Sequence, residues 1–414
     1  MTEVVITGVG VVTPIGTGVD DMWEGLISGR SGAGEITHFD PSDLPVKFAS
    51  EVRDFEPKDF MAAREVSRTD RFAQFAVAAA HLAMEHSGQE RPQCASERAG
   101  VIVGSGIGGL ITIEREHDNL HAGGPRRVSP FMVPKLMPNA AAAAIAMKLG
   151  INGVNYAPSS ACATGAHAIG EAYRAIQHGY ADVMLAGGCE AALTPLAFSA
   201  FVRMGALSTR NDDPQSASRP FDADRDGFLF GEGAGVLVLE SREHAEKRGA
   251  RTLAKIGGYG ASADAFHVTQ PDPGGKGASL AMKGAIADAG LEPEQIDYIN
   301  AHGTSTPYND RVETVAIKAT FGNEAKRVPI SSTKSQMGHF LDAAGAVEAG
   351  ICALVIERST IPPTINYSTA DPDCDLDYVT EGVRSEKVRA ALSNSFGFGG
   401  QNACLVFQAI DNAS

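Results

Sequence analysis

The chain of 414 residues has few aromatic side chains (7%), a single tryptophan and no long apolar run. Its six cysteines form no C-x-x-C pair and no Cys/His spacing typical of zinc, so neither a disulfide scaffold nor a metal site is expected. The longest middle stretch without a polar side chain, residues 140–147, is far short of the roughly 20 residues that span a bilayer. A basic segment followed by an apolar one is missing near the N-terminus, so the protein is predicted to be cytoplasmic and without a membrane anchor.

Positive charge is also in deficit. The chain has 35 Lys and Arg against 50 Asp and Glu, a formal net charge of −15. This balance argues against nucleic acid or an anionic membrane surface as the main partner. The remaining composition, 43% apolar and 21% charged, is that of an ordinary globular protein with enough chain for two or three domains.

Short β-branched runs alternate along the chain with longer segments of small residues. The runs Val101–Val103, Val183–Leu185, Val236–Leu239 and Ile296–Ile299 are predicted to be buried strands. Residues 70–86 are predicted to form a helix, because their apolar side chains recur at spacings of three and four. Alternating strands and helices indicate an α/β fold.

A weak internal repeat accompanies this pattern. Ile6-Thr7-Gly8-Val9-Gly10 near the start is echoed by Ile256-Gly257-Gly258-Tyr259-Gly260, and both are interpreted as a strand followed by a glycine turn. Each copy precedes a serine-rich strand end and an Ala/Gly-rich helix. The repeat is compatible with a duplication, but glycine-rich turns also recur by chance.

Cys162 stands at the start of a predicted helix of small residues, in Ser159-Ser160-Ala161-Cys162-Ala163-Thr164-Gly165. A thiol at the first turn of a helix lies near free N–H groups and the positive end of the helix dipole. Both favour a thiolate and stabilise an oxyanion formed there. The alternative for Cys162, and the preferred interpretation for the other five cysteines, is a small buried side chain without chemistry.

Two histidines follow predicted strands. His302 lies in Asn300-Ala301-His302-Gly303-Thr304-Ser305-Thr306, and His339 follows Lys334 in a second polar loop before an Ala/Gly-rich helix. Loops at the ends of strands are where α/β proteins place their sites. Each histidine alone is more typical of a structural hydrogen bond, but both together with an activated cysteine form a coherent acyl-transfer set.

Glycine-rich segments supply two further candidates. Asn394-Ser395-Phe396-Gly397-Phe398-Gly399-Gly400 could present backbone N–H groups or act as a gate, or it could be a tight surface turn. Gly104-x-Gly106-x-x-Gly109 matches a dinucleotide fingerprint, but the residues that follow continue it poorly, so nucleotide binding is not expected.

Taken together, these motifs resemble the β-ketoacyl-acyl-carrier-protein synthases, in particular the synthase I/II branch of the thiolase superfamily. The resemblance covers essentially the whole chain and extends to the stretches Leu207–Asn211, Ser218–Asp222, Arg225–Phe228, Gly231–Gly235 and Ile361–Asn366. It implies a five-layer αβαβα fold of two duplicated halves, here residues 1–250 and 251–414. It also implies a homodimer, no cofactor, and an acyl carrier protein as the partner that brings the substrates.

The resemblance implies a role for each candidate residue. Cys162 would be the nucleophile that accepts the acyl chain. His302 and His339 would hydrogen-bond the malonyl thioester carbonyl, and Lys334 with Glu348 would be a supporting ion pair. The remaining roles would be an oxyanion hole from the N–H groups of Cys162 and Phe398, a gate at Phe398, and substrate or pantetheine contacts at Thr304, Thr306, Thr269, Phe201 and Ile107. Ile107 would form the floor of the acyl tunnel.

Two arginine pairs are implied as the docking surface for the carrier protein: Arg64 with Arg68, and Arg126 with Arg127. The less favoured alternative is that they are ordinary solvated side chains. The chain also departs from the family pattern at Met337, Asp342 and Gln401, where many members have Thr, Gly and Thr. These departures leave the catalytic groups intact and put the chain-length preference in doubt.

Several functions remain open within this resemblance. The first is a synthase of fatty-acid elongation. The second is the catalytic ketosynthase of a type II polyketide or polyene pathway, paired with a cysteine-less chain-length partner. A non-catalytic partner subunit is disfavoured because Cys162, His302 and His339 are all present. A degradative thiolase would have a second catalytic cysteine in a place that Cys404 does not match, and a synthase III-like enzyme would have Asn in place of His339.

Overall fold

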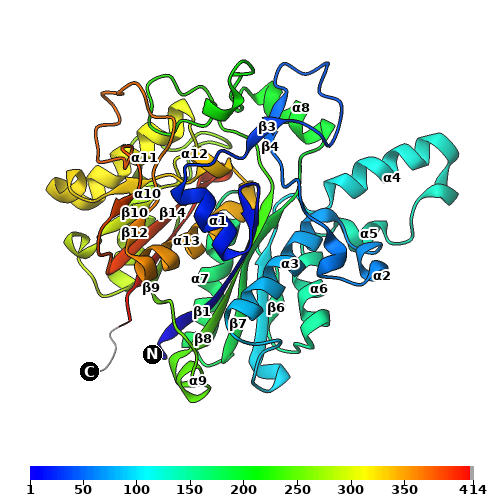
Figure 1. Ribbon diagram of the computed structural model, residues 1–414, viewed down its shortest axis with the longest axis horizontal. Coiled ribbons are helices and arrows are strands. Elements are labelled where there is room, and N and C mark those ends of the chain that lie inside the picture. Colours follow the sequence, from blue (N-terminus) through cyan, green and yellow to red (C-terminus); the bar gives the residue numbers. More distant parts are fainter. Residues whose placement is uncertain (411–414) are drawn as a thin grey trace.

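The computed structural model describes residues 1–410, and the main body is one continuous mixed β-sheet whose two parts enclose a layer of helices and are covered by further helices outside (Figure 1). The sheet is formed from two sets of five strands. The first set is β1 (Val4–Thr13), β5 (Ala99–Gly104), β6 (Asn155–Tyr156), β7 (Val183–Glu190) and β8 (Gly233–Ser241). The second set is β9 (Ala254–Ala263), β10 (Tyr298–Asn300), β11 (Ile330–Ser331), β14 (Ala390–Gly397) and β15 (Gln401–Gln408). These bounds confirm the predicted strands near residues 101, 183, 236 and 298.

The two sets repeat one topology. Across the sheet the order is β11-β10-β14-β15-β9-β1-β8-β7-β5-β6, so each set places its own strands in the order first, fifth, fourth, second, third from the centre outwards. The strand directions also repeat. In each set the first strand pairs antiparallel with the fifth, and the fifth pairs antiparallel with the fourth. The fourth strand pairs parallel with the second, and the second pairs parallel with the third. The sets meet where β1 pairs antiparallel with β9 over Val4–Ile6. The structure therefore favours duplication over chance recurrence.

The repeated glycines lie inside strands, not in turns. The prediction of a glycine turn is wrong at both places, because β1 continues to Thr13 and β9 to Ala263. A Cβ on Gly10 would lie 1.9 Å from the Ala79 carbonyl oxygen, and one on Gly260 would lie 2.1 Å from that of Ala281. Glycine is present because a helix backbone rests directly on the first strand of each half.

Those helices form the two outer layers. In the first half α3 (Arg71–His86) packs on β1 and β8 beside α6 (Ala140–Leu149), and α3 confirms the helix predicted for residues 70–86. In the second half α10 (Lys276–Asp288) packs on β9 and β15 beside α11 (Pro307–Phe321). The contacting faces consist mainly of small or branched apolar residues that are fully buried, so each outer layer closes its own apolar core.

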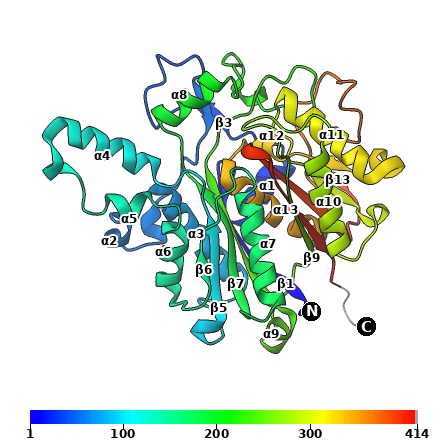
Figure 2. The ribbon, with the colours of Figure 1, turned by 180° about the vertical axis from the view of Figure 1, so that it is seen from behind.

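The middle layer consists of α7 (Thr164–Gln177) and α13 (Ala344–Arg358), which contact one another between the two five-stranded sets. α13 is buried over residues 344–356, which explains why its sequence is apolar on every side. The order of layers is therefore helix, sheet, helix, sheet, helix, which confirms the predicted five-layer α/β fold. Figure 2 shows α7 from behind, beside the strands of the first set.

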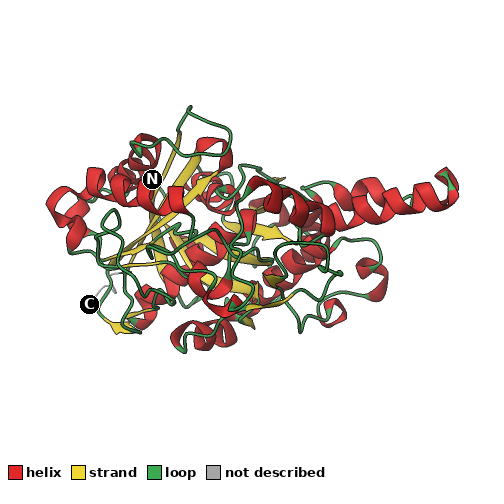
Figure 3. Ribbon diagram, turned by 90° about the horizontal axis from the view of Figure 1, so that it is seen from above, coloured by secondary structure: helices red, strands yellow, loops and turns green. Residues whose placement is uncertain are grey.

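Smaller elements surround one end of the sheet. They include α8 (Pro195–Met204), α12 (Lys334–Met337), α2 (Ala63–Val66), α5 (Met132–Leu136) and the pair β3 (Ala33–Glu35) and β4 (Phe48–Ser50). α4 (Leu110–Gly123) projects from the body, as Figure 3 shows. The remaining elements are α1 (Val19–Ile27), α9 (Arg242–Lys247), β2 (Gly16–Thr17), β12 (Thr360–Ile361) and β13 (Arg384–Ser385). Within residues 1–410, no helix is both long and apolar enough to cross a membrane.

Candidate active site

Cys162 lies in a tight turn between β6 and α7. Ala161, the residue before it, has φ +50°, a conformation that L-residues adopt only under constraint. The turn closes through the Thr164 N–H, which donates to the Ala161 carbonyl at 2.8 Å, so α7 begins two residues after the cysteine. Cys162 is 6% exposed. The turn therefore presents Sγ at the N-terminal end of a buried helix, as the sequence predicted.

The two histidines come from the second half of the molecule. His302 follows β10, and His339 follows β11 and α12 just before α13. Both are buried, at 2% and 3% exposure. β10 and β11 occupy the second and third places in the second set, and β6 the third place in the first set. The loops that follow them come from both halves to one place, since the reactive atoms of Cys162, His302 and His339 lie within 4.8 Å of one another.

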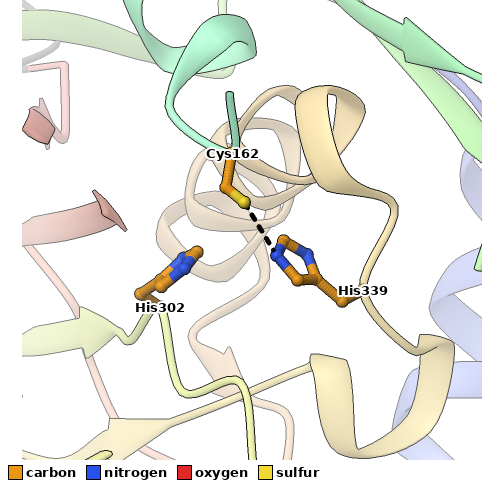
Figure 4. Close-up of side chains that lie close together, drawn as sticks. All are labelled: Cys162, His302 and His339. Atoms are coloured by element: carbon orange, nitrogen blue, oxygen red, sulfur yellow. Dashed lines mark hydrogen bonds between the residues drawn. The ribbon is translucent and has the colours of Figure 1, made fainter. Parts of the chain in front are cut away.

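Figure 4 shows the three side chains converging. His339 Nε2 lies 3.1 Å from Cys162 Sγ, and the reactive atoms of Cys162, His302 and His339 all lie within 4.8 Å of one another. The two imidazole rings are 5.4 Å apart between centroids and nearly perpendicular, at 85°. A thioester carbonyl placed above the sulfur would therefore be within reach of both rings.

A buried ion pair supports His302. Lys334 Nζ contacts the Glu348 carboxylate and lies 3.4 Å from His302 Nδ1, and both charged residues are 1% exposed. Because an ammonium only donates, it leaves the His302 proton on Nε2. Burial and the Lys334 charge hold the pKa of both imidazoles well below the usual value. Both histidines are therefore neutral at pH 7.

The resting cysteine is a thiol. Burial and the negative charge of Asp342 raise the pKa of Cys162 to about 12. Lys334 and the backbone N–H groups of Phe398 and Cys162 act in the opposite direction but do not outweigh burial. The N–H groups at the helix terminus therefore act towards a thiolate, as expected, but they do not by themselves produce one in the resting site. His339 Nε2 is placed to accept the thiol proton.

The same two N–H groups matter for substrate. Phe398 opens a loop (Phe398–Gly400) in which Gly399 and Gly400 have φ values of +78° and +70°, and Phe398 itself is half-buried. A Cβ on Gly397 would lie 2.7 Å from the Ser160 carbonyl oxygen. These glycines let the loop approach the nucleophile turn closely, so the Phe398 and Cys162 N–H groups both face Sγ.

Glu313 was missed by the sequence argument. Its two oxygens accept the backbone N–H groups of His302 and Gly303, each at 2.8 Å, and Asn394 donates to it at 3.1 Å. Burial raises the pKa of Glu313 to about 7 against these opposing hydrogen bonds. One signal was available: Glu313 shares the apolar face of α11 with Ala316 and Ile317, an unusual position for an acid.

A pocket of about 250 Å³ opens above Cys162. Its lining includes four of the predicted contacts, Thr304, Thr306, Thr269 and Phe398, in addition to the cysteine and both histidines. Ile107 and Phe201 do not line it. They pack instead in an adjoining apolar cluster that contains Leu341 and Phe228, which do face the pocket. The assignment of Ile107 as the tunnel floor stays a prediction.

The predicted docking arginines lie elsewhere. Arg64, Arg68, Arg126 and Arg127 are all exposed. The first pair is on α2 and just after it, and the second is on the short turn Pro125–Arg127 beyond α4. Figure 1 shows α2 and α4 at one end of the molecule and α11, which lines the pocket, towards the other. Within one chain the structure does not bring the arginines to the pocket.

The departures from the family pattern occupy three environments. Met337 is 2% exposed, and its carbonyl oxygen accepts the Ser50 hydroxyl at 2.5 Å. Gln401 is exposed at the start of β15. Asp342 is buried directly below the nucleophile turn. For a metal, the buried Lys334 ammonium beside His302 makes the cysteine–histidine cluster unfavourable, since a second cation would be repelled.

A nucleophilic cysteine under two neutral imidazoles, on a duplicated five-layer α/β fold, defines a condensing acyltransferase of the thiolase-like class. The β-ketoacyl synthase N-terminal domain matches residues 1–245, and the β-ketoacyl synthase C-terminal domain matches residues 253–368. The chain therefore belongs to the β-ketoacyl synthase family.

Similar proteins agree with this family. The chain is 49% identical over 408 residues to a 3-oxoacyl-[acyl-carrier-protein] synthase 2 of Coxiella burnetii, covering 99% of each sequence. Among solved structures, the ishigamide ketosynthase/chain length factor superposes with a TM-score of 0.93 at 38% identity, covering 99% of this chain and 100% of that one. A type II polyketide ketosynthase in complex with its acyl carrier protein superposes at 0.91 and 35% identity, with the same coverage.

Proposed function

We propose that this protein catalyses the decarboxylative condensation of a Cys162-bound acyl chain with malonyl-acyl carrier protein in fatty-acid elongation. The observation that carries the proposal is the convergence of one thiol and two neutral imidazoles within 4.8 Å. Neutral imidazoles suit an enolate, because each donates one hydrogen bond without protonating the carbanion. The 3-oxoacyl synthase relatives support elongation as the pathway.

The first half-reaction loads the acyl chain. The Cys162 thiol gives its proton to His339 Nε2, and Sγ attacks the carbonyl carbon of the incoming thioester. The N–H groups of Phe398 and Cys162 stabilise the oxyanion. When the tetrahedral intermediate collapses, the carrier's pantetheine thiolate leaves and takes up the proton. The product is an acyl group on Sγ, with Thr304 and Thr306 proposed as contacts for the pantetheine arm.

The second half-reaction forms the carbon–carbon bond. The bond between the malonyl methylene and its carboxylate breaks, CO₂ leaves, and the electron pair forms an enolate. His302 donates to the enolate oxygen from Nε2, and His339 does the same after its one proton, held on Nδ1 during loading, has exchanged through solvent to Nε2. The enolate carbon then attacks the acyl carbonyl, the bond between Sγ and the carbonyl carbon breaks, and the Cys162 thiolate that leaves takes up a proton from solvent to regenerate the thiol. Decarboxylation supplies the electron pair, so the reaction needs no cofactor.

A homodimer is proposed as the working assembly. β6 is the outermost strand of the sheet, and an exposed strand edge is a ready place for pairing with another chain. Large apolar side chains are exposed on and near it and on the neighbouring α4–α6 region: Leu120, Phe131, Val133, Met137, Met147 and Tyr156. Their burial against a second copy would explain why they are apolar. Location in the cytoplasm stays a prediction.

A second candidate is the catalytic ketosynthase subunit of a type II polyketide or polyene synthase. The structural neighbours favour it, since one of them is the ishigamide ketosynthase/chain length factor. In this case the exposed β6 edge would pair with a different, cysteine-less chain. The chemistry at Cys162 would be the same, and only the acyl chain and the partner would differ.

The test is intact-protein mass spectrometry after incubation with acyl-carrier-protein thioesters of graded length. The proposal expects one acyl group on Cys162 and no adduct on the Cys162→Ala variant, which also loses condensation. Cys352→Ala is the matched control, since Cys352 is also buried but is not among the residues that line the pocket. Acylation of the Cys162→Ala variant would overturn the proposal. A preference for saturated chains favours elongation, whereas a preference for polyketide or polyene intermediates favours the second candidate.

A further inference from the structure

Two buried carboxyl groups lie behind the nucleophile and take no part in the reaction described above. Asp342 is 2% exposed and Glu190, at the end of β7, is fully buried. They face one another, since each is a side-chain hydrogen-bond partner of the other. Buried acids are rare and costly without partners, so a pair at this place calls for a reason.

Asp342 is tied to the turn that carries the nucleophile. Thr164 Oγ1 donates to Asp342 Oδ1 at 2.8 Å, and the same Thr164 hydroxyl accepts the Ser160 N–H at 2.8 Å. Asp342 therefore braces both ends of the Ser160–Thr164 turn through one hydroxyl. Because Asp342 lies three residues after His339, the same segment also sets the distance between that imidazole and Sγ.

Glu190 is tied to the loop after β5. Its Oε2 accepts the Ser105 hydroxyl at 3.2 Å and the backbone N–H groups of Gly106 and Ile107 at 3.3 and 3.1 Å. The loop lies directly on Asp342, since a Cβ on Gly106 would be 2.2 Å from Asp342 Oδ1. The pair thus joins the nucleophile turn to the segment that contains Ile107.

One proton is shared within the pair. Burial raises the pKa of both carboxyls, and that of Glu190 well above its usual range because Asp342 is an adjacent negative charge. Two carboxylates in contact cannot both be charged at low cost. Glu190 is therefore the protonated member, which donates to Asp342, and Asp342 is the carboxylate, which accepts from Glu190 and Thr164.

We propose that Asp342 and Glu190 form a positioning pair that holds the Cys162 turn and keeps a negative charge off Sγ until substrate arrives. This inference rests on Cys162 being the nucleophile of the proposed function. Asp342 supplies the charge and the brace, and Glu190 supplies the proton that allows a carboxylate to remain buried there. In a chain with glycine at position 342, the nucleophile turn would lack both the brace and the charge.

The charged and titratable groups around Sγ limit what else could have this effect. Lys334 from α12 acts in the opposite direction, and Glu348 from α13 is paired with it. His302 and His339 are neutral. The pair itself faces one further titratable group, the fully buried thiol of Cys189 on β7, which stays protonated. Asp342 is thus the anion whose charge acts directly on the Cys162 thiol.

The rate of Cys162 alkylation by iodoacetamide between pH 6 and 9 tests the proposal, with peptide mass spectrometry separating Cys162 from the half-buried Cys94. Only the thiolate reacts, so the rate reports its population. Asp342→Asn and Asp342→Gly should react at least tenfold faster than the unchanged protein at each pH, and their profiles should level off at lower pH. Glu190→Gln should stay within twofold, because the glutamine still donates to Asp342.

Asp70→Asn is the matched control. Asp70 is also a buried carboxyl that accepts a threonine hydroxyl, from Thr112 at 2.5 Å, but it lies outside the pocket. It should leave the rate unchanged. Rates within twofold for both Asp342 variants, or equal acceleration by Glu190→Gln, would overturn the proposal. Alkylation requires no condensation, so failure of the proposed function would appear separately, as absent acylation with an intact alkylation profile.

Discussion

At the residue scale, the site separates the tasks of its two histidines. His339 Nε2 lies 3.1 Å from Sγ, whereas His302 is held by Lys334 on one side and has its proton on the other. The resting cysteine is a thiol whose pKa is about 12, so it needs a proton acceptor before it can attack. His339 is the only one of the two rings hydrogen-bonded to the sulfur among the described residues. Loading should therefore depend on His339 more than on His302.

Substitution of each histidine tests this division. In both the His302→Ala and the His339→Ala variant, the activation free energy of malonyl decarboxylation should rise by roughly 2.7–4 kcal/mol, the usual cost of removing one oxyanion donor. Acyl loading should be slowed in His339→Ala and nearly normal in His302→Ala. Single-turnover acylation and CO₂ release, measured separately, distinguish the two steps. Equal loading rates in the two variants would remove the proton-acceptor role from His339.

The sequence identified the side chains that react and, through the family resemblance, the supporting pair Lys334 and Glu348, but not the other groups that hold them. Cys162, His302 and His339 stand at predicted strand ends with glycines nearby, which are local signals. Glu313, Glu190 and Asn394 reach the site only through packing between elements that lie far apart along the chain. Asp342 was noticed as a departure, but its partner Glu190 and its hydrogen bond to Thr164 depend on tertiary contacts that no local pattern encodes.

At the element scale, α11 holds the loop that carries His302. Glu313 on α11 accepts two backbone N–H groups of this loop, and its pKa is about 7 instead of the usual 4.5. The folded protein therefore binds this proton more tightly than the unfolded chain does. The stability that this group contributes is fully present below pH 4.5 and is lost as the pH rises to about 7.

Comparison with Glu313→Gln isolates this dependence. One pKa unit corresponds to about 1.4 kcal/mol, so the unchanged protein should lose roughly 3 kcal/mol relative to the variant between pH 4.5 and 7. Urea unfolding at several pH values measures the difference between the two proteins. Asp297→Asn is a control, because Asp297 also accepts two backbone N–H groups but lies at the other end of β10, just before the strand begins. If the free energy of unfolding depended on pH in the same way in Glu313→Gln and in the unchanged protein, the raised pKa of Glu313 would be contradicted.

The contact of α10 on β9 makes a second prediction at this scale. A Cβ on Gly260 would lie 2.1 Å from the Ala281 carbonyl oxygen, and backbone cannot move aside as a side chain can. Gly260→Ala should therefore cost about 1–3 kcal/mol or more. Gly10→Ala should do the same in the first half. Gly284→Ala is the matched control in α10: its Cβ has no neighbour nearer than 3.5 Å, and it should stabilise by about 0.5–1 kcal/mol.

Chemical denaturation of Gly260→Ala, Gly10→Ala and Gly284→Ala shows whether a glycine is needed for close packing of a helix on the strand or only for a turn of the chain. If Gly260→Ala were as stable as the unchanged protein, the helix would not rest on the strand. The sequence predicted the long elements named above correctly, because strands such as β8 are continuous apolar runs and α3 has a clear helical period. It failed at the glycines, because a residue that lets another backbone approach has the same local signature as one that turns.

At the scale of the whole molecule, the site lies where two copies of one topology meet. The first half supplies Cys162 and the loop with Ile107, and the second supplies His302, His339, Lys334 and Phe398. Neither half alone contains both a nucleophile and a hydrogen-bond donor for the enolate. The repeat was only weakly visible in the sequence, because what the two halves share is the order of their strands in the sheet and a pair of glycines in the first strand of each half. The proposed division at residues 250 and 251 stays a prediction as a boundary between domains.

The distribution of charge over the whole molecule bears on how substrate arrives. The protein carries a net charge of −15, and acyl carrier proteins are also acidic, so the two repel at long range. Productive encounter then requires a local basic surface. Arg126 and Arg127 are exposed beside the projecting α4, and Arg68 is fixed over the Phe131 ring at 4.8 Å, close to the same end. In one chain these arginines lie away from the pocket, so they can serve it only through the proposed dimer.

Charge reversal at Arg126 and Arg127 tests this surface. The Arg126→Glu, Arg127→Glu double variant should raise the KM for carrier-bound substrates several-fold, and the effect should fade at high salt because exposed charges are screened within about 8–10 Å. Small thioester mimics should react normally, since they need no docking surface. Lys387→Glu with Arg389→Glu is the matched control, with the same change of net charge at two other exposed positions. An equal rise in KM with the control pair would mean that net charge alone governs the encounter. A loss of activity towards both kinds of substrate would mean that the arginines support the fold and not the partner.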